Sequence, residues 1–288
     1  MSERDNDFTV VKLPRFQRQM IDWLDLNTRH PVFIVCEVDV TEARQLIRDF
    51  RNRTGRPLSL TAYITSFFAS AIAENRMVQA YKAGRRKIAI FEDVDVAMVV
   101  ERDIQGFKIP LPAVVRSAER LSPADIDAEI RLARHGDTPQ AWAQPLLGPW
   151  LLLPSIVRRF VLRRLLANPR RRKKITGTTM VSAAGMFGHG AGWGITPPSY
   201  TISLVTGSLI RKPCVVGDGI EPREILGLTI AFDHDIVDGA VGARFAQRFK
   251  EMIEDCRTLR PLDDDSAQAS TAAFENVEDD TSAVAPAL

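Results

Sequence analysis

The chain has 288 residues, of which 45% are hydrophobic and 26% are charged, with 17 glycines and 17 prolines. This composition is ordinary for a globular protein and excludes a collagen, a coiled coil and a wholly disordered chain. The three cysteines are widely spaced, which excludes a disulfide framework and a C-x-x-C metal site and makes a cytoplasmic location the simplest expectation. The first residues do not form a signal peptide, and no apolar run is long enough to span a bilayer, so we expect a soluble protein.

Alternating apolar residues predict strands, and apolar residues at helical spacing predict helices. In chain order the predicted elements are a helix at 16–24, a strand at 31–40, a helix at 41–53, a buried helix at 60–76, strands at 87–91, 94–100 and 107–115, a helix at 122–134, strands at 178–182, 200–204 and 226–233, and a helix at 240–256. Thr41 and Ser122 are expected to cap the helices that begin beside them. Strands interleaved with helices indicate an α/β (α+β) domain with a mixed sheet.

The net charge of +2 conceals a strong asymmetry along the chain. Seven acidic residues and no Lys or Arg follow Pro261, and the segment 262–288 has the composition of a disordered acidic tail. Residues 1–261 carry a net charge of +9, and the nine basic residues of Val157–Lys174 account for all of it. A nucleic-acid-binding domain spreads its basic charge over a face, so this single patch indicates no nucleic-acid partner.

The first candidate site lies in the turn between the strand that ends near Asp233 and the last helix. His234, Asp238 and Gly239 form the pattern H-x-x-x-D-G. A histidine at the end of a strand is held by the backbone beside it, and its ordinary pKa suits proton abstraction near neutral pH. Asp238 could support it electrostatically or act as an anion at the helix N-terminus, and Gly239 would allow a tight reversal. The alternative interpretation of the same pattern is a surface histidine, without a catalytic role, that precedes a capped helix.

The second candidate site is the glycine-rich stretch TGTTMVSAAGMFGHGAGWGITPPSY, which begins at Thr176. Ser182 lies in it, 52 residues before His234. A serine at a strand end usually satisfies backbone groups, so only its combination with His234 makes it a candidate. His189 is a weaker candidate base because a glycine-rich loop orients it poorly, and it could line a thiol channel with Trp193.

Together the two stretches resemble the catalytic domain of the dihydrolipoyl acyltransferases, the inner core of 2-oxo acid dehydrogenase complexes. VSAAGMFG followed by TPP resembles the serine-bearing stretch of that family, and Asp233–Ala240 resembles its D-H-x-x-x-D-G-A motif. Upstream, CEVDVTEARQL, LSLTAYITSFFASAIAEN, VDVAMVV and IPLPAVVRSAERLSPADIDAEI follow in the family's order, so the resemblance covers about residues 10–260. It implies a chloramphenicol acetyltransferase-like two-layer sandwich for residues 1–261.

The resemblance also implies a CoA-dependent acyl transfer. His234 would deprotonate the thiol of CoA or of a dihydrolipoyl group, and the Ser182 hydroxyl would stabilise the tetrahedral oxyanion. Asp238 would be a structural partner, paired with Arg15 or Arg18 of the first helix. The family forms homotrimers, or multiples of them, in which the histidine and the serine meet across a subunit interface. CoA would be a substrate, with no permanently bound cofactor and no metal.

The chain departs from the family pattern in three respects. Asp235 follows the histidine where the family typically has an arginine. We expect the catalytic domain to occupy the whole chain, without a lipoyl domain, so a lipoyl group would come in trans from a partner protein, or the acceptor would not be lipoyl at all. Residues 136–176 form an insertion, irregular and proline-rich and then basic. Within it, residues 146–174 resemble an interfacial helix with an apolar and a basic face, which could bind an anionic membrane, a partner helix or the CoA phosphates, or could simply be solvated.

Three classes of function remain open from the sequence. The first is an acyltransferase of the dihydrolipoyl type, with a small-molecule O- or N-acyltransferase as the alternative within the enzyme class. The second is a non-catalytic core or scaffold subunit, which the missing carrier domains and Asp235 would suit. The third is a module tethered to a membrane or a partner by the basic insertion.

Overall fold

The computed structural model describes residues 3–4, 9–10, 15–26, 29–84, 86–104, 107–135, 154–183, 190–197 and 199–256. Its helices are α1 (Arg15–Leu26), α2 (Thr41–Thr54), α3 (Leu60–Glu74), α4 (Pro123–His135), α6 (Ser155–Leu166), α7 (Pro169–Thr176) and α8 (Gly239–Asp255), with short 3₁₀ turns at Arg76–Gln79 and Ala118–Arg120. Its strands are β1 (Glu3–Arg4), β2 (Thr9–Val10), β3 (Pro31–Asp39), β4 (Tyr81–Lys82), β5 (Ile88–Ala89), β6 (Val96–Ile104), β7 (Phe107–Val115), β8 (Thr179–Ser182), β9 (Ile202–Val216) and β10 (Gly219–Asp233).

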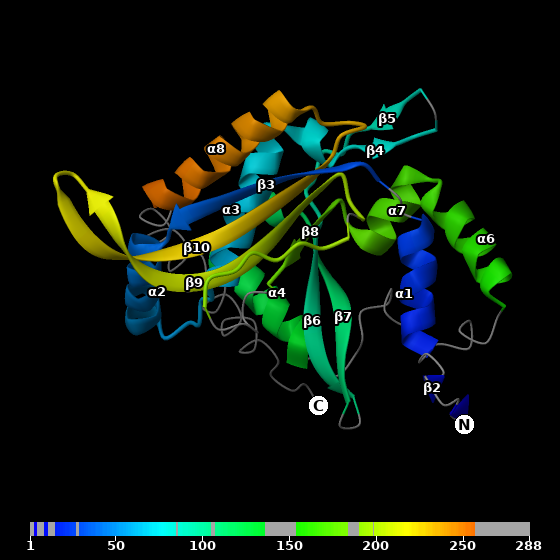
Figure 1. The fold of residues 1–288 in the computed structure, drawn as a ribbon, viewed down its shortest axis with the longest axis horizontal. Coiled ribbons are helices and arrows are strands. Elements are labelled where there is room, and N and C mark those ends of the chain that lie inside the picture. Colours follow the sequence, from blue (N-terminus) through cyan, green and yellow to red (C-terminus); the bar gives the residue numbers. More distant parts are fainter. Residues whose placement is uncertain are drawn as a thin grey trace, which may run out of the picture.

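A six-stranded sheet in the order β3-β10-β9-β8-β6-β7 organises the molecule (Figure 1). The short strand β8 runs parallel to both of its neighbours, β6 and β9, whereas the other three pairs are antiparallel. The sheet is therefore mixed. With helices packed against it, it confirms the predicted α/β architecture.

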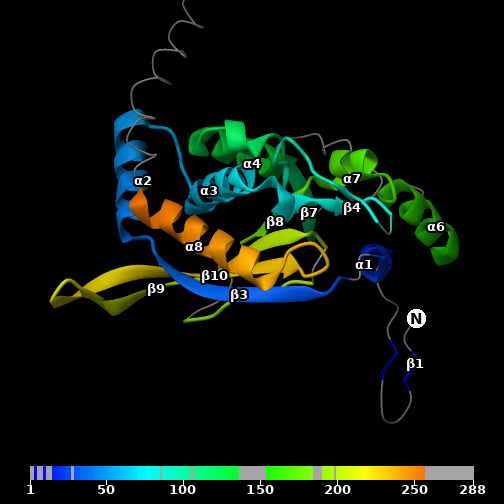
Figure 2. The ribbon, with the colours of Figure 1, turned by 90° about the horizontal axis from the view of Figure 1, so that it is seen from above.

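The hydrophobic core lies between this sheet and the layer formed by α3, α4 and α8 (Figure 2). Helix α3 is buried on almost all sides, as its uniformly apolar sequence predicts, and α8 turns one apolar face toward it. The rings of Phe68 and Phe249 meet edge to face with centroids 5.4 Å apart, which joins the two helices.

Of the two predicted helix caps, the structure contains one. At α4 the backbone N–H of Asp125 donates to the Ser122 hydroxyl over 3.2 Å, which confirms the predicted cap. At α2 the prediction was wrong, because Thr41 is already the first helical residue and Val40 precedes it without a side-chain cap. The Thr41 hydroxyl instead accepts the N–H of Glu224 at 2.8 Å and so fixes α2 to β10.

The hairpin of β9 and β10 is much longer than predicted, since each strand has 15 residues. Its outer half projects beyond the helix layer (Figure 1). There the side chains of β9 alternate between half-buried and exposed, whereas the first four residues of β10 are all exposed. The predicted strand at 87–91 is also shorter than expected. Only Ile88–Ala89 pairs, and it forms a separate hairpin with Tyr81–Lys82.

The basic insertion is largely helical. Residues 155–166 form α6 and residues 169–176 form α7. The irregular structure expected for the insertion was therefore wrong here, whereas the helix expected within 146–174 is confirmed, as two helices. Residues 136–153 and the acidic segment 262–288 lie outside the described residues. Helix α6 packs on α1, where Arg158 donates to Asp22 over 2.6 and 3.0 Å; the two side chains are only 7% and 6% exposed. Within the described ranges, no helix has the length and apolarity needed to cross a bilayer.

Replacing Arg158 with Met is expected to lower the free energy of unfolding by about 3–5 kcal/mol, because it leaves the buried Asp22 carboxylate without its cation. The matched control is Arg159→Met. Arg159 belongs to the same helix and pairs with Asp25 at 3.1 Å, but both side chains are more than 40% exposed, so the cost should stay below about 1 kcal/mol. Urea unfolding measures both values, and equal effects of the two substitutions would contradict this assignment.

Candidate active site

His234 stands at the point where β10 leaves the sheet. Its backbone N–H donates to the carbonyl oxygen of His30 over 2.9 Å, and the N–H of Asp233 donates to Thr201 over 2.8 Å. The backbone that leads into the histidine is therefore fixed to neighbouring segments. Its imidazole is exposed in this single protomer.

A buried ion pair lies directly under this histidine. Arg29 donates to the carboxylate of Asp233 over 2.5 Å, and the two side chains are 7% and 1% exposed. The other oxygen of that carboxylate accepts the N–H of Asp235 at 3.3 Å, so Asp233 connects the strand to the turn. Sequence reasoning assigned no role to Arg29 or Asp233, although an aspartate that ends an apolar strand indicates that a buried cation faces it.

Asp238 is the N-cap of α8. Its carboxylate accepts the N–H of Val241 at 2.8 Å, which is the helix-terminal role that the sequence left open for it. The side chains of Arg15 and Arg18 lie outside the described residues, so their pairing with Asp238 stays a prediction. The expectation for Gly239 was wrong. Its φ is not left-handed, and a Cβ atom there would meet no described atom within 4 Å, so the turn does not require glycine.

Asp235 joins the turn to two other segments. Its carboxylate accepts hydrogen bonds from Lys82 of β4 and from Nδ1 of His30, the latter at 3.1 Å. The hydrogen bond from Lys82, followed by that from His30, lowers the pKa of Asp235 below its ordinary value. The negative charge of Asp235, next to His234, is therefore stabilised by Lys82 and His30.

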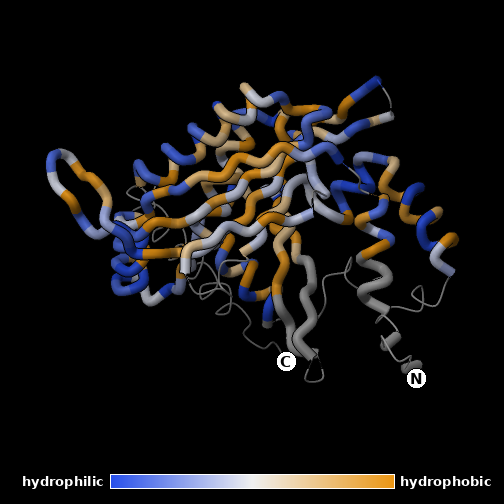
Figure 3. The backbone as a smooth tube through the Cα atoms, viewed as in Figure 1, coloured by the Kyte–Doolittle hydropathy of each residue, from blue (hydrophilic) through white to orange (hydrophobic). Residues whose placement is uncertain are grey.

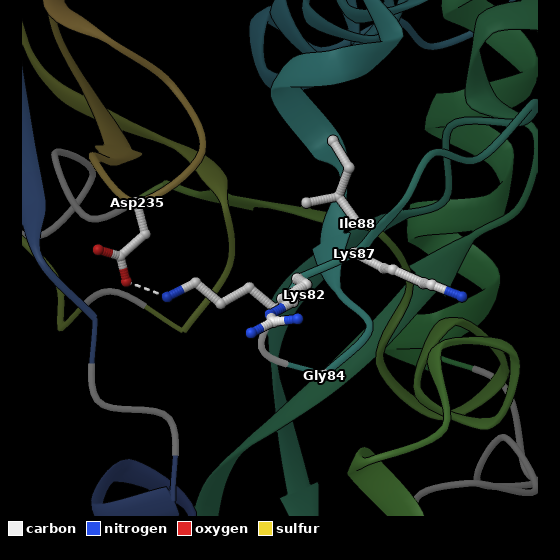
Figure 4. Close-up of a pocket in the computed structure, with 6 residues that line it drawn as sticks. Lys82, Gly84, Lys87, Ile88 and Asp235 are labelled. Carbon is white, nitrogen blue, oxygen red and sulfur yellow. Dashed lines mark hydrogen bonds and ion pairs between the residues drawn. The ribbon is translucent and has the colours of Figure 1, made fainter.

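An open pocket of about 590 Å³ adjoins this contact (Figure 4). It is lined by Lys82, Gly84, Arg86, Lys87, Ile88 and Asp235. Lys82 reaches across to Asp235, whereas Lys87 points away from that pair. Three cations against one carboxylate make the pocket positively charged beside the histidine turn. Across the part of the chain that is described, no group of His, Cys, Asp and Glu side chains has the arrangement of a metal site.

Ser182 ends β8, on the sheet face opposite the helix layer. The strand register places it beside Val205 of β9, and Val205 beside Thr229 of β10. Thr229 precedes His234 by five residues, which corresponds to about 17 Å along a strand, and two strand spacings of about 4.8 Å separate β8 from β10. Ser182 and His234 are therefore not brought together within one protomer.

The segment 190–197, which follows the Ser182 loop, crosses closely over the sheet. The Trp193 indole donates to the carbonyl of Cys36 over 3.3 Å. A Cβ atom at Gly207 would lie 2.4 Å from the carbonyl oxygen of Gly192, and one at Gly227 would lie 2.9 Å from the Trp193 indole nitrogen. These two glycines are required because the crossing segment touches the sheet backbone. His189 lies outside the described residues.

Arg172, Tyr81 and Tyr200 join the insertion to β4 and to the segment that leads into β9. Arg172 of α7 stacks on the Tyr81 ring at 4.3 Å from its centroid and donates to the carbonyl of Ser199 over 2.9 Å. The Tyr200 hydroxyl donates to the carbonyl of Thr176 over 2.8 Å. Burial raises the pKa of both tyrosines, so they stay neutral, and it lowers the pKa of Arg172. The inner side of α7 therefore packs against the rest of the protein and stabilises the fold.

Replacing Arg29 with Met is expected to lower the free energy of unfolding by about 3–5 kcal/mol, because the buried Asp233 carboxylate loses its cation. The double variant Arg29→Met/Asp233→Asn should recover part of this loss, since it removes the uncompensated charge. Lys82→Met is the control, because it breaks the more exposed pair with Asp235 and should cost much less than Arg29→Met. Chemical denaturation measures all three, and a double variant no more stable than Arg29→Met would contradict the paired-charge account.

Several relatives resemble the chain in sequence. The dihydrolipoyllysine-residue succinyltransferase component of a mitochondrial 2-oxoglutarate dehydrogenase complex from Arabidopsis thaliana is 24% identical over 77% of this chain and 42% of its own length. The dihydrolipoyllysine-residue acetyltransferase component of the pyruvate dehydrogenase complex from Acholeplasma laidlawii is 26% identical over 86% of this chain and 41% of its own. The chain thus spans well under half the length of these relatives.

Solved structures share the fold. A probable dihydrolipoamide acetyltransferase from Listeria monocytogenes superposes with a TM-score of 0.64 at 19% identity, over 87% of this chain and 96% of the other. The cubic core of a pyruvate dehydrogenase multienzyme complex and the dihydrolipoamide acetyltransferase of Azotobacter vinelandii each superpose with a TM-score of 0.63 at 16% identity, over 87% of this chain and 93% of theirs.

The family model for the 2-oxoacid dehydrogenases acyltransferase catalytic domain matches residues 5–138 and 164–260. The gap between the two matched segments, 139–163, falls inside the predicted insertion and contains most of α6. The matched residues cover most of the chain and include Ser182, His234 and Asp238. The chain belongs to the family of 2-oxoacid dehydrogenase acyltransferase catalytic domains.

Proposed function

We propose that the chain is a CoA-dependent acyltransferase of the dihydrolipoyl type, with His234 as general base and Ser182 as oxyanion stabiliser. One observation carries this assignment. In the Azotobacter vinelandii acetyltransferase, a serine, a histidine and an asparagine have been investigated for their role in the catalytic mechanism, and they are separated by 52 and four residues. Ser182, His234 and Asp238 have the same two separations. Their shared fold and family support the correspondence.

The third position differs in identity, since an aspartate replaces the asparagine. Asn and Asp are equally effective N-caps, and Asp238 caps α8 in this protomer. The exchange is therefore compatible with the same local geometry. The role that we assign to Asp238 is to hold the start of α8, and with it the turn that bears His234.

The proposed reaction moves an acyl group between two thiols. His234 takes the proton from the attacking thiol of a dihydrolipoyl group or of CoA, and the thiolate attacks the carbonyl carbon of the acyl thioester. The Ser182 hydroxyl donates a hydrogen bond to the oxyanion that forms. When the intermediate collapses, the original C–S bond breaks and the departing thiolate receives the proton from His234.

Because Ser182 and His234 lie far apart in one protomer, we place the complete site between protomers of a homotrimer or of a multiple of it. The histidine turn of one copy would face the Ser182 strand of the next. The cubic core among the structural neighbours is an assembly of this kind of domain and is consistent with an oligomer. The lipoyl group would be supplied in trans by a partner protein, and CoA would be a substrate.

His234→Ala is expected to lower the turnover of acyl-CoA with dihydrolipoamide by about 10²–10⁴-fold, and Ser182→Ala by about 10²–10³-fold. Release of free CoA, followed with and without dihydrolipoamide, measures both. Undiminished turnover in His234→Ala would show that this histidine is not the base. A correctly assembled oligomer without any turnover would favour a non-catalytic core, and turnover only with a hydroxyl or amine acceptor would favour the small-molecule alternative.

Co-expression of His234→Ala with Ser182→Ala tests where the site is formed. If each site takes its histidine from one protomer and its serine from another, random mixing leaves about a quarter of the sites intact, so activity should return to that level. Mixtures made after assembly, without subunit exchange, are the control and should stay inactive. Failure of the co-expressed pair to regain activity, in oligomers shown to be mixed, would contradict a shared site.

A further inference from the structure

Helices α6 and α7 present an exposed surface at one end of the molecule, next to α1 (Figures 1 and 2). We call it the α6–α7 face. It is defined by Ile156, Phe160, Arg163, Arg164, Arg170, Arg171 and Lys174. Ile156, Phe160 and Arg163 of α6 fall in the gap of the family match, whereas Arg164 and the whole of α7 lie within the matched segment 164–260.

The centre of the face on α6 is apolar. Ile156 and Phe160 are 80% and 66% exposed and lie one helical turn apart, and Arg163 follows on the same side. The buried Arg158 lies on the opposite side of α6, against α1. The helix is hence already fixed by its inner side, while two large apolar side chains remain in solvent. Figure 3 shows the resulting alternation of hydrophobic and hydrophilic residues along α6.

The basic residues of the segment separate into two groups. The first group is used inside the protein. It comprises Arg158, Arg159 and Lys173, which form ion pairs with Asp22, Asp25 and Asp93, and Arg172, which stacks on Tyr81.

The second group faces outward. Arg163 and Arg164 of α6 and Arg170, Arg171 and Lys174 of α7 are all exposed, and none forms an ion pair with another described residue. No Asp or Glu occurs between Asp137 and Asp218, so no acidic residue nearby in the chain neutralises them. The face therefore combines two exposed apolar side chains with five exposed basic side chains.

We propose that the α6–α7 face binds the surface of a bilayer that contains anionic phospholipids. Such a surface complements both features, because Ile156 and Phe160 enter the boundary of the acyl chains while the guanidinium and ammonium groups contact lipid phosphates. Long arginine side chains reach the headgroups while their stems stay beside the apolar residues. The proposal does not depend on acyl transfer, since none of these residues belongs to the catalytic assignment.

Sedimentation of the full chain with vesicles tests this proposal directly. We expect it to bind vesicles of phosphatidylcholine mixed with phosphatidylglycerol and not vesicles of phosphatidylcholine alone, and salt should weaken the binding. Arg163→Gln/Arg164→Gln should lower the partition coefficient about 25-fold, since each cation near an anionic surface contributes about fivefold. Ile156→Ser/Phe160→Ser should lower it by about tenfold or more.

Matched controls make the test specific to this face. Arg51→Gln/Arg53→Gln removes two basic residues from the last turn of α2, and Val215→Ser/Ile220→Ser removes two side chains that are 79% and 75% exposed on the β9–β10 hairpin. Both controls should bind like the parent protein. Equal binding to both kinds of vesicle, no binding, or equal losses in the controls would overturn the proposal. A change in oligomeric state in Ile156→Ser/Phe160→Ser without lipid binding would instead identify the face as an interface between copies.

Discussion

The buried pair of Arg29 and Asp233 is the interaction on which the candidate site depends most directly. It closes the end of β10 against the segment that leads into β3, and it does so in a place where a lone carboxylate would be strongly unfavourable. Because Asp233 also accepts the N–H of Asp235, the same carboxylate sets the start of the turn that carries His234. The ion pair at the adjacent residue thus holds the backbone of this exposed turn, and with it His234, in a fixed position.

The insertion contributes to that rigidity as well as to the surface. Arg158 holds α1 through Asp22, and Arg172 stacks on Tyr81 close to the end of the sheet. Removing the whole segment would therefore disturb the catalytic domain, and such a deletion could not separate a surface function from a structural one. Substitutions confined to the α6–α7 face leave Arg158 and Arg172 in place, so they can separate the surface function from the structural one.

The position of Ser182 relative to His234 is a constraint set by sheet register. A residue on β8 and a turn after β10 are separated along the strands by five residues, and no side chain is long enough to close that distance. A site that uses both residues must then be made by two copies of the chain. Oligomerisation would be part of the chemistry of this fold, because each protomer presents one half of the site on a different part of its surface.

The sequence by itself determined the order and type of most helices and strands, the family and the candidate residues, because these depend on local periodicity and on short motifs. It did not determine that Thr41 bonds to β10, that Gly239 needs no special conformation, or that the β9–β10 hairpin extends so far, since each depends on contacts between distant segments. The side-chain partners of Asp233, Asp235 and Arg158 lie 136 to 205 residues away in the chain, and nothing local identifies them. Only the packed structure decided which charges are buried and paired and which remain on the surface, because burial is a property of assembled elements and not of any one segment.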